Sequence, residues 1–202
     1  MVKNIVFDMG GVLVEFSPQK VLDRFFTKEE SKFITENVFN TTMWRERDRG
    51  TLQSEQLLLN VRHLFSEEVY CKLRKFVLNF FAYMPEFDDV CETIKMLKEQ
   101  GYGLYVLSNC SPDFYQNGQY IKSIRYFDGL LLSCDCGFLK PEPEIYEHLF
   151  NKFGLNAGEC IFFDDLQENV DGAIAMGMQA FRFNHDDMQS FNAELRRVGV
   201  KI

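Results

Sequence analysis

The sequence contains a small set of acidic, hydroxyl and basic residues whose chemistry together suits the transfer of a phosphoryl group. A carboxylate can attack phosphorus and form an aspartyl-phosphate. Neighbouring carboxylates repel one another unless a hard cation such as Mg²⁺, which takes oxygen ligands, lies between them. A lysine and a hydroxyl group can bind the non-bridging oxygens and stabilise the charge that develops there. The candidates stand at the ends of apolar runs or before a helical pattern: Asp8, Ser108, Asn109, Lys140, Asp164 and Asp165.

Short apolar runs precede most of these candidates, and helical patterns separate the runs. None of the runs alternates cleanly between apolar and polar residues, which indicates strands buried on both faces of a parallel sheet. Strands that alternate with helices predict an α/β fold, a Rossmann-like doubly wound parallel sheet. Ligands of such sheets gather at the carboxyl ends of the strands, so we expect the candidates to converge there. The predicted strands are Asn4–Phe7, Gly103–Leu107, Leu130–Ser133 and Cys160–Phe163, with a weaker fifth at Ala180–Phe183.

Only helical signals occur between about Ser17 and Met84. Ser17 followed by Pro18 is typical of a helix start, and Ser66 followed by two glutamates is another. We therefore predict an all-helical cap at residues 17–85, inserted into a Rossmann-like core made of residues 1–16 and 86–202. In the core, further helices are expected around residues 90–97, over Pro141–Phe153 with Lys140 at its beginning, and over Asn169–Met176.

The composition limits the partners that the protein can have. The chain has 202 residues, 46% of them hydrophobic, and a formal net charge of −8, which disfavours nucleic acid and anionic membranes as partners. No apolar run approaches the length of a membrane span, and the first residues do not resemble a signal peptide, so we expect a cytoplasmic protein. The six cysteines are expected to be free thiols. A small phosphorylated metabolite is the expected partner, and the protein is expected to be a monomer or a homodimer.

Four motifs resemble those of the haloacid dehalogenase superfamily, in the right order and after the right elements. The match covers nearly the whole chain and includes a helical cap of the C1 type, as in subfamily IA. The first motif, with glycines after the aspartate, resembles that of sugar-1-phosphate phosphatases. The motifs are VFDMGGVL at residues 6–13, LSN at 107–109, KPEPEIY at 140–146, and FDD at 163–165 followed by Asn169.

The resemblance implies a role for each matching residue. Asp8 would be the nucleophile and, with the Gly10 carbonyl group, a ligand of Mg²⁺. Asp164 would bind Mg²⁺ directly, and Asp165 directly or through water. Catalysis would rest on Asp8, Ser108 and Lys140, and the residues expected to face the substrate are Gly10, Gly11, Ser108, Asn109 and Lys140. The helical cap would act as a lid that excludes water and contacts the leaving group.

Gly10 is where the sequence departs from the family pattern. Most such phosphatases have a second aspartate at this position. It protonates the leaving group and then activates water, and such general acid–base catalysis raises the rate by about 10²–10⁴-fold. Three consequences are open. The substrate could need little protonation, as anomeric sugar phosphates do; Glu15 or a cap residue could supply the proton; or turnover could be lost. The absence of this aspartate argues against a phosphomutase.

The cap contains three arginines close together after Trp44. We expect Arg45 to contribute to substrate binding, against the alternative that this segment is a solvated, salt-bridged helix end. Trp44 could stack on a sugar or pack the cap.

The prediction for function is a Mg²⁺-dependent phosphatase that hydrolyses a small phosphomonoester, a sugar phosphate by preference, through an aspartyl-phosphate on Asp8. The alternatives are a phosphate-binding regulatory protein with weakened catalysis and a metal-free haloacid dehalogenase. Asp164 and Asp165 favour phosphate chemistry over the dehalogenase, which lacks an acidic pair.

Overall fold

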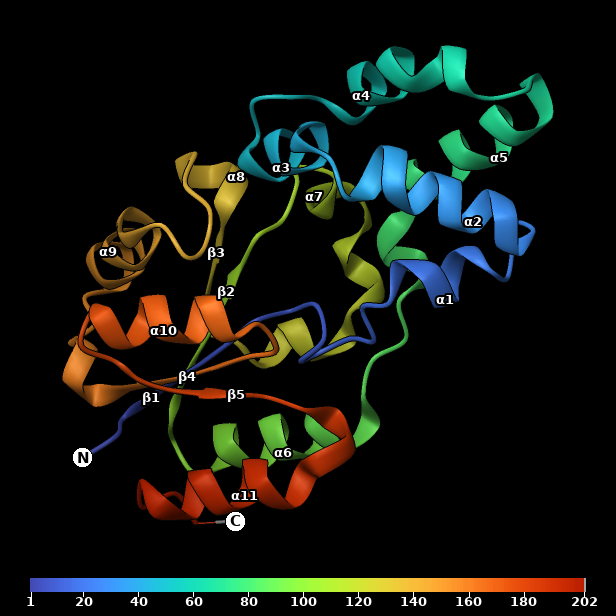
Figure 1. The fold of residues 1–202 in the computed structure, drawn as a ribbon. Helices are drawn as coiled ribbons and strands as arrows, with labels where there is room; N and C mark the ends of the chain where they lie inside the picture. The colour runs from blue at the N-terminus through green and yellow to red at the C-terminus, as the bar shows by residue number, and fades with distance from the viewer. Residues whose placement is uncertain (202) are drawn as a thin grey trace.

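The centre of the molecule is a five-stranded parallel sheet. Its strands are β1 (Asn4–Phe7), β2 (Gly103–Ser108), β3 (Gly129–Leu132), β4 (Cys160–Asp164) and β5 (Gln179–Arg182). The computed structural model describes residues 1–201, and in it the strand order is β3-β2-β1-β4-β5 with all neighbours parallel (Figure 1). The predicted doubly wound α/β sheet is confirmed, and each predicted strand lies within one residue of its observed bounds.

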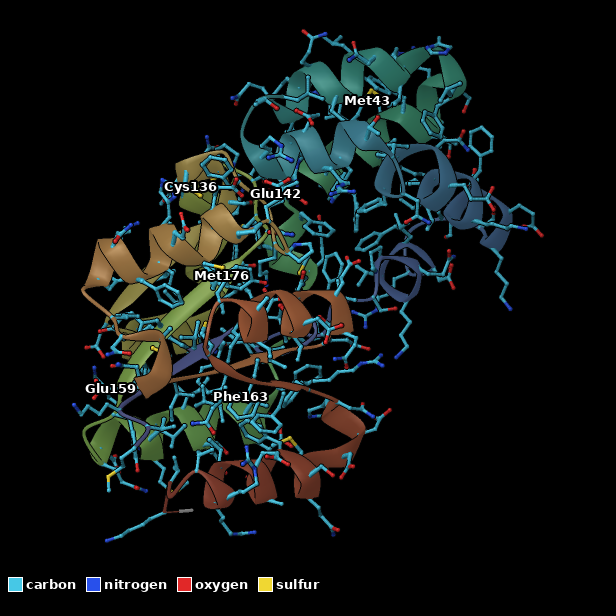
Figure 2. The ribbon with its side chains drawn as sticks, turned by 60° about the vertical axis from the view of Figure 1, so that its left-hand side comes forward. Met43, Cys136, Glu142, Glu159, Phe163 and Met176 are labelled. Atoms are coloured by element: carbon cyan, nitrogen blue, oxygen red, sulfur yellow. The ribbon has the colours of Figure 1, made fainter. Side chains whose placement is uncertain are left out.

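Helices cover both faces of this sheet. The helices that lead into or follow strands β2 to β5 are α6 (Asp88–Glu99), α7 (Phe114–Asn117), α8 (Ser133–Cys136), α9 (Pro143–Phe153), α10 (Gln167–Ala175) and α11 (Met188–Arg197), with short turns η4 (Gly118–Tyr120), η5 (Lys122–Tyr126), η6 (Ala157–Glu159) and η7 (His185–Asp187). Helices α9 and α10 lie on one face, where Val6 and Phe162 are buried, and α6 and α11 lie on the other (Figure 1). On that second face Phe163 contacts Phe191 of α11, with 4.8 Å between ring centroids (Figure 2).

Helix α9 corrects one prediction. It begins at Pro143, so Lys140 does not begin the helix but lies in a turn before it. In this turn the Glu142 N–H donates to the Leu139 carbonyl oxygen at 2.7 Å, and the Leu139 N–H donates to the Glu142 carboxylate at 3.0 Å. Glu142 precedes Pro143 and has an extended backbone, with ψ at 131°, as proline favours for the residue before it, so the helix starts only at Pro143.

Between Pro18 and Tyr83, after β1 and before α6, the chain forms only helices and the turns that connect them, as predicted. We call this segment the helical insert; it contains α1 (Pro18–Leu22), α2 (Lys28–Ile34), η1 (Thr35–Phe39), α3 (Thr42–Arg49), α4 (Ser54–Val61), η2 (Arg62–Leu64), α5 (Glu67–Leu78) and η3 (Phe80–Tyr83). Side chains cap several of these helices: Thr27 and Glu30 form a capping box, and Ser66 accepts from Val69 N–H. The insert has an aromatic core of its own, in which Phe39, Trp44, Phe76 and Phe80 pack together.

Two backbone contacts join the chain segments that enter and leave the insert. The Glu15 N–H donates to the Pro85 carbonyl oxygen at 2.9 Å, and the Phe87 N–H donates to the Leu13 carbonyl oxygen at 3.0 Å. Farther out, Arg49 of α3 makes a two-pronged ion pair with Glu142, with N–O distances of 2.9 and 2.6 Å (Figure 2). The insert is therefore attached to the sheet at its base and contacts the segment before α9 at its far side.

All six cysteines are free thiols. Among the described residues, no helix combines the length and the apolar character that a membrane crossing needs.

Candidate active site

Three neighbouring strands bring the predicted residues to one edge of the sheet. Asp8 directly follows β1, Ser108 ends β2 and Asp164 ends β4, and β1 lies between the other two in the sheet. All three strands are parallel, so their carboxyl ends meet at the same edge. The side chains of all three residues are buried. The convergence that the sequence predicts is therefore present in the structure.

Lys140 links the strand ends electrostatically. Its Nζ lies 2.8 Å from Asp8 Oδ1 and 2.6 Å from Asp164 Oδ2, and it donates to the Leu107 carbonyl oxygen at 2.9 Å. The side chain is only 1% exposed. Asn109 holds the backbone of Lys140 from both sides: its Oδ1 accepts from the Lys140 N–H at 2.7 Å, and its Nδ2 donates to the Lys140 carbonyl oxygen at 3.0 Å. Asn109 thus positions the lysine.

Asp164 is held by donors on the other side. Asn169 Nδ2 lies 2.9 Å from Oδ1 and 3.1 Å from Oδ2, and the Leu166 N–H donates to Oδ1 at 2.9 Å. These contacts and Lys140 hold the buried carboxyl group of Asp164 in one orientation. Asn169 therefore braces the acidic residue.

Asp8, Asp164 and Asp165 can all direct one oxygen to a common point. The ligand atoms of the three lie within 4.8 Å of one another. Burial raises the pKa of Asp8 from 3.8 to about 7; Lys140 opposes this rise, and the charges of Asp164 and Asp165 add to it. Burial and Asp164 likewise raise the pKa of Asp165 to about 6. One ammonium group thus faces three carboxylates. The excess negative charge and the all-oxygen donor set fit a divalent hard cation such as Mg²⁺.

Gly11 makes the close approach of Asp165 possible. Its φ is +74°, and a Cβ atom at this position would lie 2.6 Å from Asp165 Oδ2. Only glycine takes such a conformation without cost and leaves this space open. The predicted contact of Gly11 with substrate stays a prediction, because Gly11 does not line the main cavity described below.

We expect Gly11→Ala to lower the affinity for Mg²⁺ by about tenfold or more, because the methyl group displaces a carboxylate from the acidic cluster. Gly154→Ala is the matched control, since Gly154 also has a positive φ (+65°) but has no atom within 4 Å of a Cβ. In both variants, alanine at a positive φ should destabilise the fold by about 1–2 kcal/mol. Titrating the Mg²⁺-induced rise in Tm would separate them. Equal Mg²⁺ affinities in the two variants would contradict this role of Gly11.

A cavity of about 260 Å³ lies between the sheet edge and the helical insert, and we call it the main cavity. The core contributes Asp8, Gly10, Ser108, Asn109, Lys140, Asp165, Leu166 and Asn169, and the insert and the segment leading to it contribute Phe16, Pro18, Phe39, Asn40, Trp44 and Asp48. Most of the predicted site residues therefore share one enclosed space. Arg45 is exposed and does not line it, so its part in substrate binding stays a prediction. The metal contact of the Gly10 carbonyl group also stays a prediction.

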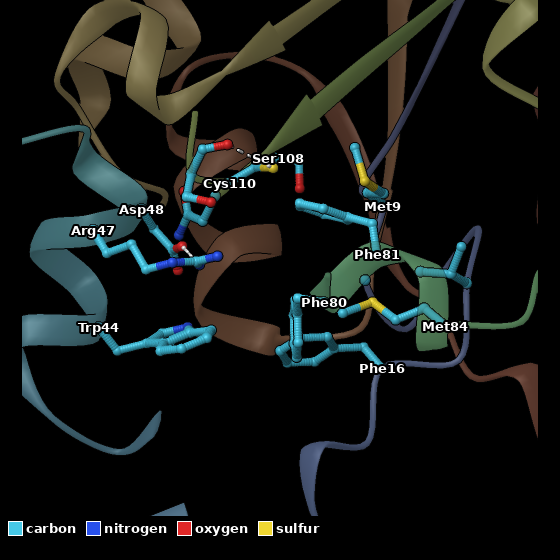
Figure 3. Close-up of a pocket in the computed structure, with 14 residues that line it drawn as sticks. Met9, Phe16, Trp44, Arg47, Asp48, Phe80, Phe81, Met84, Ser108 and Cys110 are labelled. Atoms are coloured by element: carbon cyan, nitrogen blue, oxygen red, sulfur yellow. Dashed lines mark hydrogen bonds and ion pairs between the residues drawn. The ribbon is translucent and has the colours of Figure 1, made fainter. Parts of the chain in front are cut away.

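Trp44 packs the insert and also lines the main cavity, so its stacking on a substrate stays a prediction. Its ring has Phe39 at 4.2 Å between centroids and the Arg47 guanidinium at 4.3 Å from its centroid. A smaller recess of about 50 Å³ lies beside it, shares Gly10, Asp48 and Ser108 with the main cavity, and is bordered by Phe80, Phe81 and Met84. Figure 3 shows Arg47 over the Trp44 ring, with Asp48 beside it.

Asp48 is a cavity residue that the sequence does not reveal. It lies in the last turn of α3, next to Arg47 and Arg49, where a pattern of alternating charges is typical of a solvated helix end. In the structure its side chain is only 17% exposed, and it lines both the main cavity and the smaller recess. The available signal was an acidic residue between arginines close to the only tryptophan, which does not by itself indicate a site.

Comparison with known proteins agrees with this geometry. The chain is 29% identical over 181 residues to the sesquiterpene phosphatase of Aspergillus oryzae, with 87% of each chain covered. It is 27% identical over 197 residues to the D-ribitol-5-phosphate phosphatase of Bacteroides thetaiotaomicron, covering 90% of this chain and 92% of the relative. A solved structure of a HAD-family enzyme from Bacteroides thetaiotaomicron in complex with magnesium and inorganic phosphate has the same fold, with a TM-score of 0.66 at 20% identity over 90% of this chain and 94% of that one.

A family model adds the decisive comparison. The model for haloacid dehalogenase-like hydrolases matches residues 2–177, which include β1 to β4 and all four motifs. The residues that these motifs supply are those that meet at the sheet edge. This chain belongs to the haloacid dehalogenase-like hydrolases.

Proposed function

We propose that the protein is a Mg²⁺-dependent phosphatase that hydrolyses a small phosphomonoester through an aspartyl-phosphate on Asp8. The observation that carries the proposal is the buried cluster in which Lys140 lies between Asp8 and Asp164, with Asp165 close enough to share a cation. The two phosphatase relatives, each aligned over nearly its whole length, support the reaction class. The related fold that holds magnesium and phosphate supports the choice of ligand.

The residues can divide the reaction into two displacements. Asp8 Oδ1 faces Lys140, and no described residue hydrogen bonds to Oδ2, which is therefore available for attack on phosphorus. As the new bond forms, the bond between phosphorus and the leaving oxygen breaks. Water then attacks the phosphorus of the aspartyl-phosphate and releases inorganic phosphate and the Asp8 carboxylate. Asp8 thus ends each cycle as it began.

The other residues hold the transferring group. Lys140 and the Ser108 hydroxyl group can bind the non-bridging oxygens, because Ser108 lines the main cavity beside Lys140. Asp8, Asp164 and Asp165 would hold Mg²⁺. When bound, Mg²⁺ supplies the positive charge that lets a phosphate group approach three carboxylates. Asn109 and Asn169 keep Lys140 and Asp164 in place.

Sugar phosphates are the substrate class that we propose to test first. The main cavity, at about 260 Å³, suits a small leaving group, and its insert side offers the polar side chains Asn40 and Asp48 between the aromatic walls of Phe16 and Phe39. The ribitol phosphate phosphatase relative supports a polyol or sugar, and the sesquiterpene phosphatase relative supports an apolar alcohol as the second class. Phosphate release from sugar, prenyl, aryl and nucleotide phosphates, each with and without Mg²⁺, would rank them.

Removal of the metal is expected to stop the reaction. With EDTA, phosphate release should fall to background, and readdition of Mg²⁺ should restore it. Mg²⁺ should also raise the Tm of the protein, because a bound cation relieves the repulsion among the three carboxylates, and Asp165→Asn should reduce that rise. Turnover that EDTA does not affect would favour the haloacid dehalogenase alternative. If Mg²⁺ raised the Tm but no ester were hydrolysed, the alternative of a phosphate-binding regulatory protein would be favoured.

A further inference from the structure

We propose that Asp48 of the helical insert donates the proton to the leaving group and then accepts one from the attacking water, in place of the acidic residue that is missing at Gly10. The inference rests on the proposed phosphatase function. Asp48 and Gly10 both line the main cavity and both line the smaller recess beside it. In each of these spaces, Asp48 is the only carboxylate that the insert contributes.

The contacts of Asp48 leave one of its oxygens without a hydrogen bond from the described residues. Its Oδ1 lies 3.2 Å from Arg47 Nη1, and no described residue hydrogen bonds to its Oδ2. Asp113 instead holds Arg47 more closely, with Oδ2 at 2.8 Å from Nη2, and the same oxygen accepts from Ser54, whose Oγ also accepts from Arg47 Nε at 2.6 Å. The buried guanidinium is therefore paired mainly with Asp113, and Asp48 is its looser partner.

The charges around Asp48 allow it to hold a proton. The groups that face it are Arg47 on its own helix, Asp113 before α7, Cys110 after β2 and Cys134 on α8. Burial raises the pKa of Asp48 to about 7; Arg47 opposes this rise, and Asp113 adds to it. A general acid is most effective when its pKa is near the working pH. Asp48 thus has the acidity and the position that the two steps need.

Glu15 does not compete for this role. Its carboxylate lies 3.1 Å from Lys20 Nζ, and its side chain lines a neighbouring hollow, which shares Phe16 and Asp165 with the main cavity. It lines neither the main cavity nor the smaller recess. Because Asp48 is on α3 of the helical insert, the insert supplies the proton donor as well as covering the site. The donor reaches the leaving group only where α3 covers the sheet edge.

The two steps balance in atoms and charge. When Asp8 attacks, the electron pair of the breaking bond stays on the leaving oxygen, which takes the Asp48 proton and departs as an alcohol. Asp48, now a carboxylate, takes a proton from water as the water oxygen bonds to phosphorus. The products are the alcohol, hydrogen phosphate and the free Asp8 carboxylate, and Asp48 is protonated again.

The test is a series of aryl and alkyl phosphates whose leaving alcohols differ in pKa, assayed with Mg²⁺ on wild type and Asp48→Asn. For wild type, kcat/KM should depend only weakly on leaving-group pKa. For Asp48→Asn, kcat/KM should stay within about threefold of wild type for p-nitrophenyl phosphate and fall by about 10²-fold or more for alkyl phosphates. An equal fall for all esters would mean a structural role and would overturn the inference, as would a steep dependence in wild type itself.

Two further variants control the test. Asp113→Asn removes the charge that raises the pKa of Asp48 and leaves Arg47 to pair with Asp48, so it should lower kcat/KM for alkyl phosphates more than for p-nitrophenyl phosphate, in the same direction as Asp48→Asn. Gly10→Asp should give little gain in wild type but should restore alkyl phosphate turnover in Asp48→Asn. A Cβ at Gly10 would lie 3.1 Å from Cγ and 3.2 Å from Cβ of Phe16, so Phe16 must move by a few tenths of an ångström to admit the new side chain. No restoration, with both proteins folded by their Tm, would count against Asp48. Absence of turnover in wild type would instead contradict the phosphatase function.

Discussion

Asp8→Asn is expected to reduce kcat/KM for every phosphomonoester by about 10⁴-fold or more, because the amide is not a nucleophile at phosphorus and no second path to the aspartyl-phosphate exists in the cluster. Wild-type protein quenched with acid during turnover should carry one phosphoryl group on the peptide that contains Asp8, and the variant should carry none. Steady-state kinetics measures the first result, and mass spectrometry of the digested protein measures the second.

The variant should lose activity without losing its fold. Asparagine has the same shape as aspartate and removes a carboxylate that burial and two like charges already disfavour. In EDTA at neutral pH, the free energy of unfolding of Asp8→Asn should therefore equal or exceed that of wild type. Asp171→Asn, which changes an exposed aspartate on α10, is the control for a general effect of charge. Retention of activity within tenfold, or a phosphoryl group on another residue, would remove Asp8 as the nucleophile.

The sheet and the acidic cluster could be predicted because local sequence determines them. Runs such as Cys160–Phe163 are short and apolar at every position, as is typical of a strand covered on both faces, and β4 is buried at all five residues. Once the strands are known, the rule that parallel carboxyl ends share an edge places Asp8 beside Asp164. For Lys140 the sequence predicts the wrong element, because the turn at 139–142 includes a hydrogen bond from the Leu139 N–H to the Glu142 side chain, and periodicity does not contain such contacts.

The insert side of the site could not be predicted in the same way. Whether Asp48 or Arg45 faces the cavity depends on how α3 is turned relative to the sheet, and long-range contacts decide this. Arg49 pairs with Glu142, and the Ser133 hydroxyl group donates to the Asp48 carbonyl oxygen, so partners about 85 to 93 positions away orient the helix. Helical spacing shows which residues share a face, but the face that meets another domain follows from tertiary contacts.

Lys140→Met is expected to reduce kcat/KM by about 10²–10³-fold, because a cation that would bind the non-bridging oxygens is lost. It should also destabilise the protein by about 3 kcal/mol at pH 8 in EDTA, since it leaves buried carboxylates without their counter-charge. Methionine has a similar length and keeps the apolar contacts of the stem. Urea unfolding in EDTA at pH 5 and pH 8 measures the second effect.

The destabilisation should grow with pH. In wild type the pKa of Asp8 is raised from 3.8 to about 7, and Lys140 is the group that limits the rise. Without Lys140 this pKa moves higher. At pH values between the unfolded and folded pKa of Asp8, the folded state keeps a proton that the unfolded state has released. The free energy of unfolding therefore falls as the pH rises through this range. In Lys140→Met the free energy of unfolding should keep falling above pH 7, whereas in wild type the fall ends near that pH.

Removing the Asp8 charge as well should recover part of the lost stability. In the double variant Lys140→Met/Asp8→Asn, the carboxylate that suffers most from the loss of Lys140 is gone, while Asp164 keeps its bonds from Asn169 and the Leu166 N–H. The double variant is therefore expected to be more stable at pH 8 than Lys140→Met alone, and its stability should depend less on pH. If both proteins were equally unstable and equally pH-dependent, the cost would come from packing around residue 140, and the electrostatic account of the cluster would be wrong. Recovery would show instead that Lys140 keeps Asp8 ionised, which is the state that a nucleophile needs before any substrate binds.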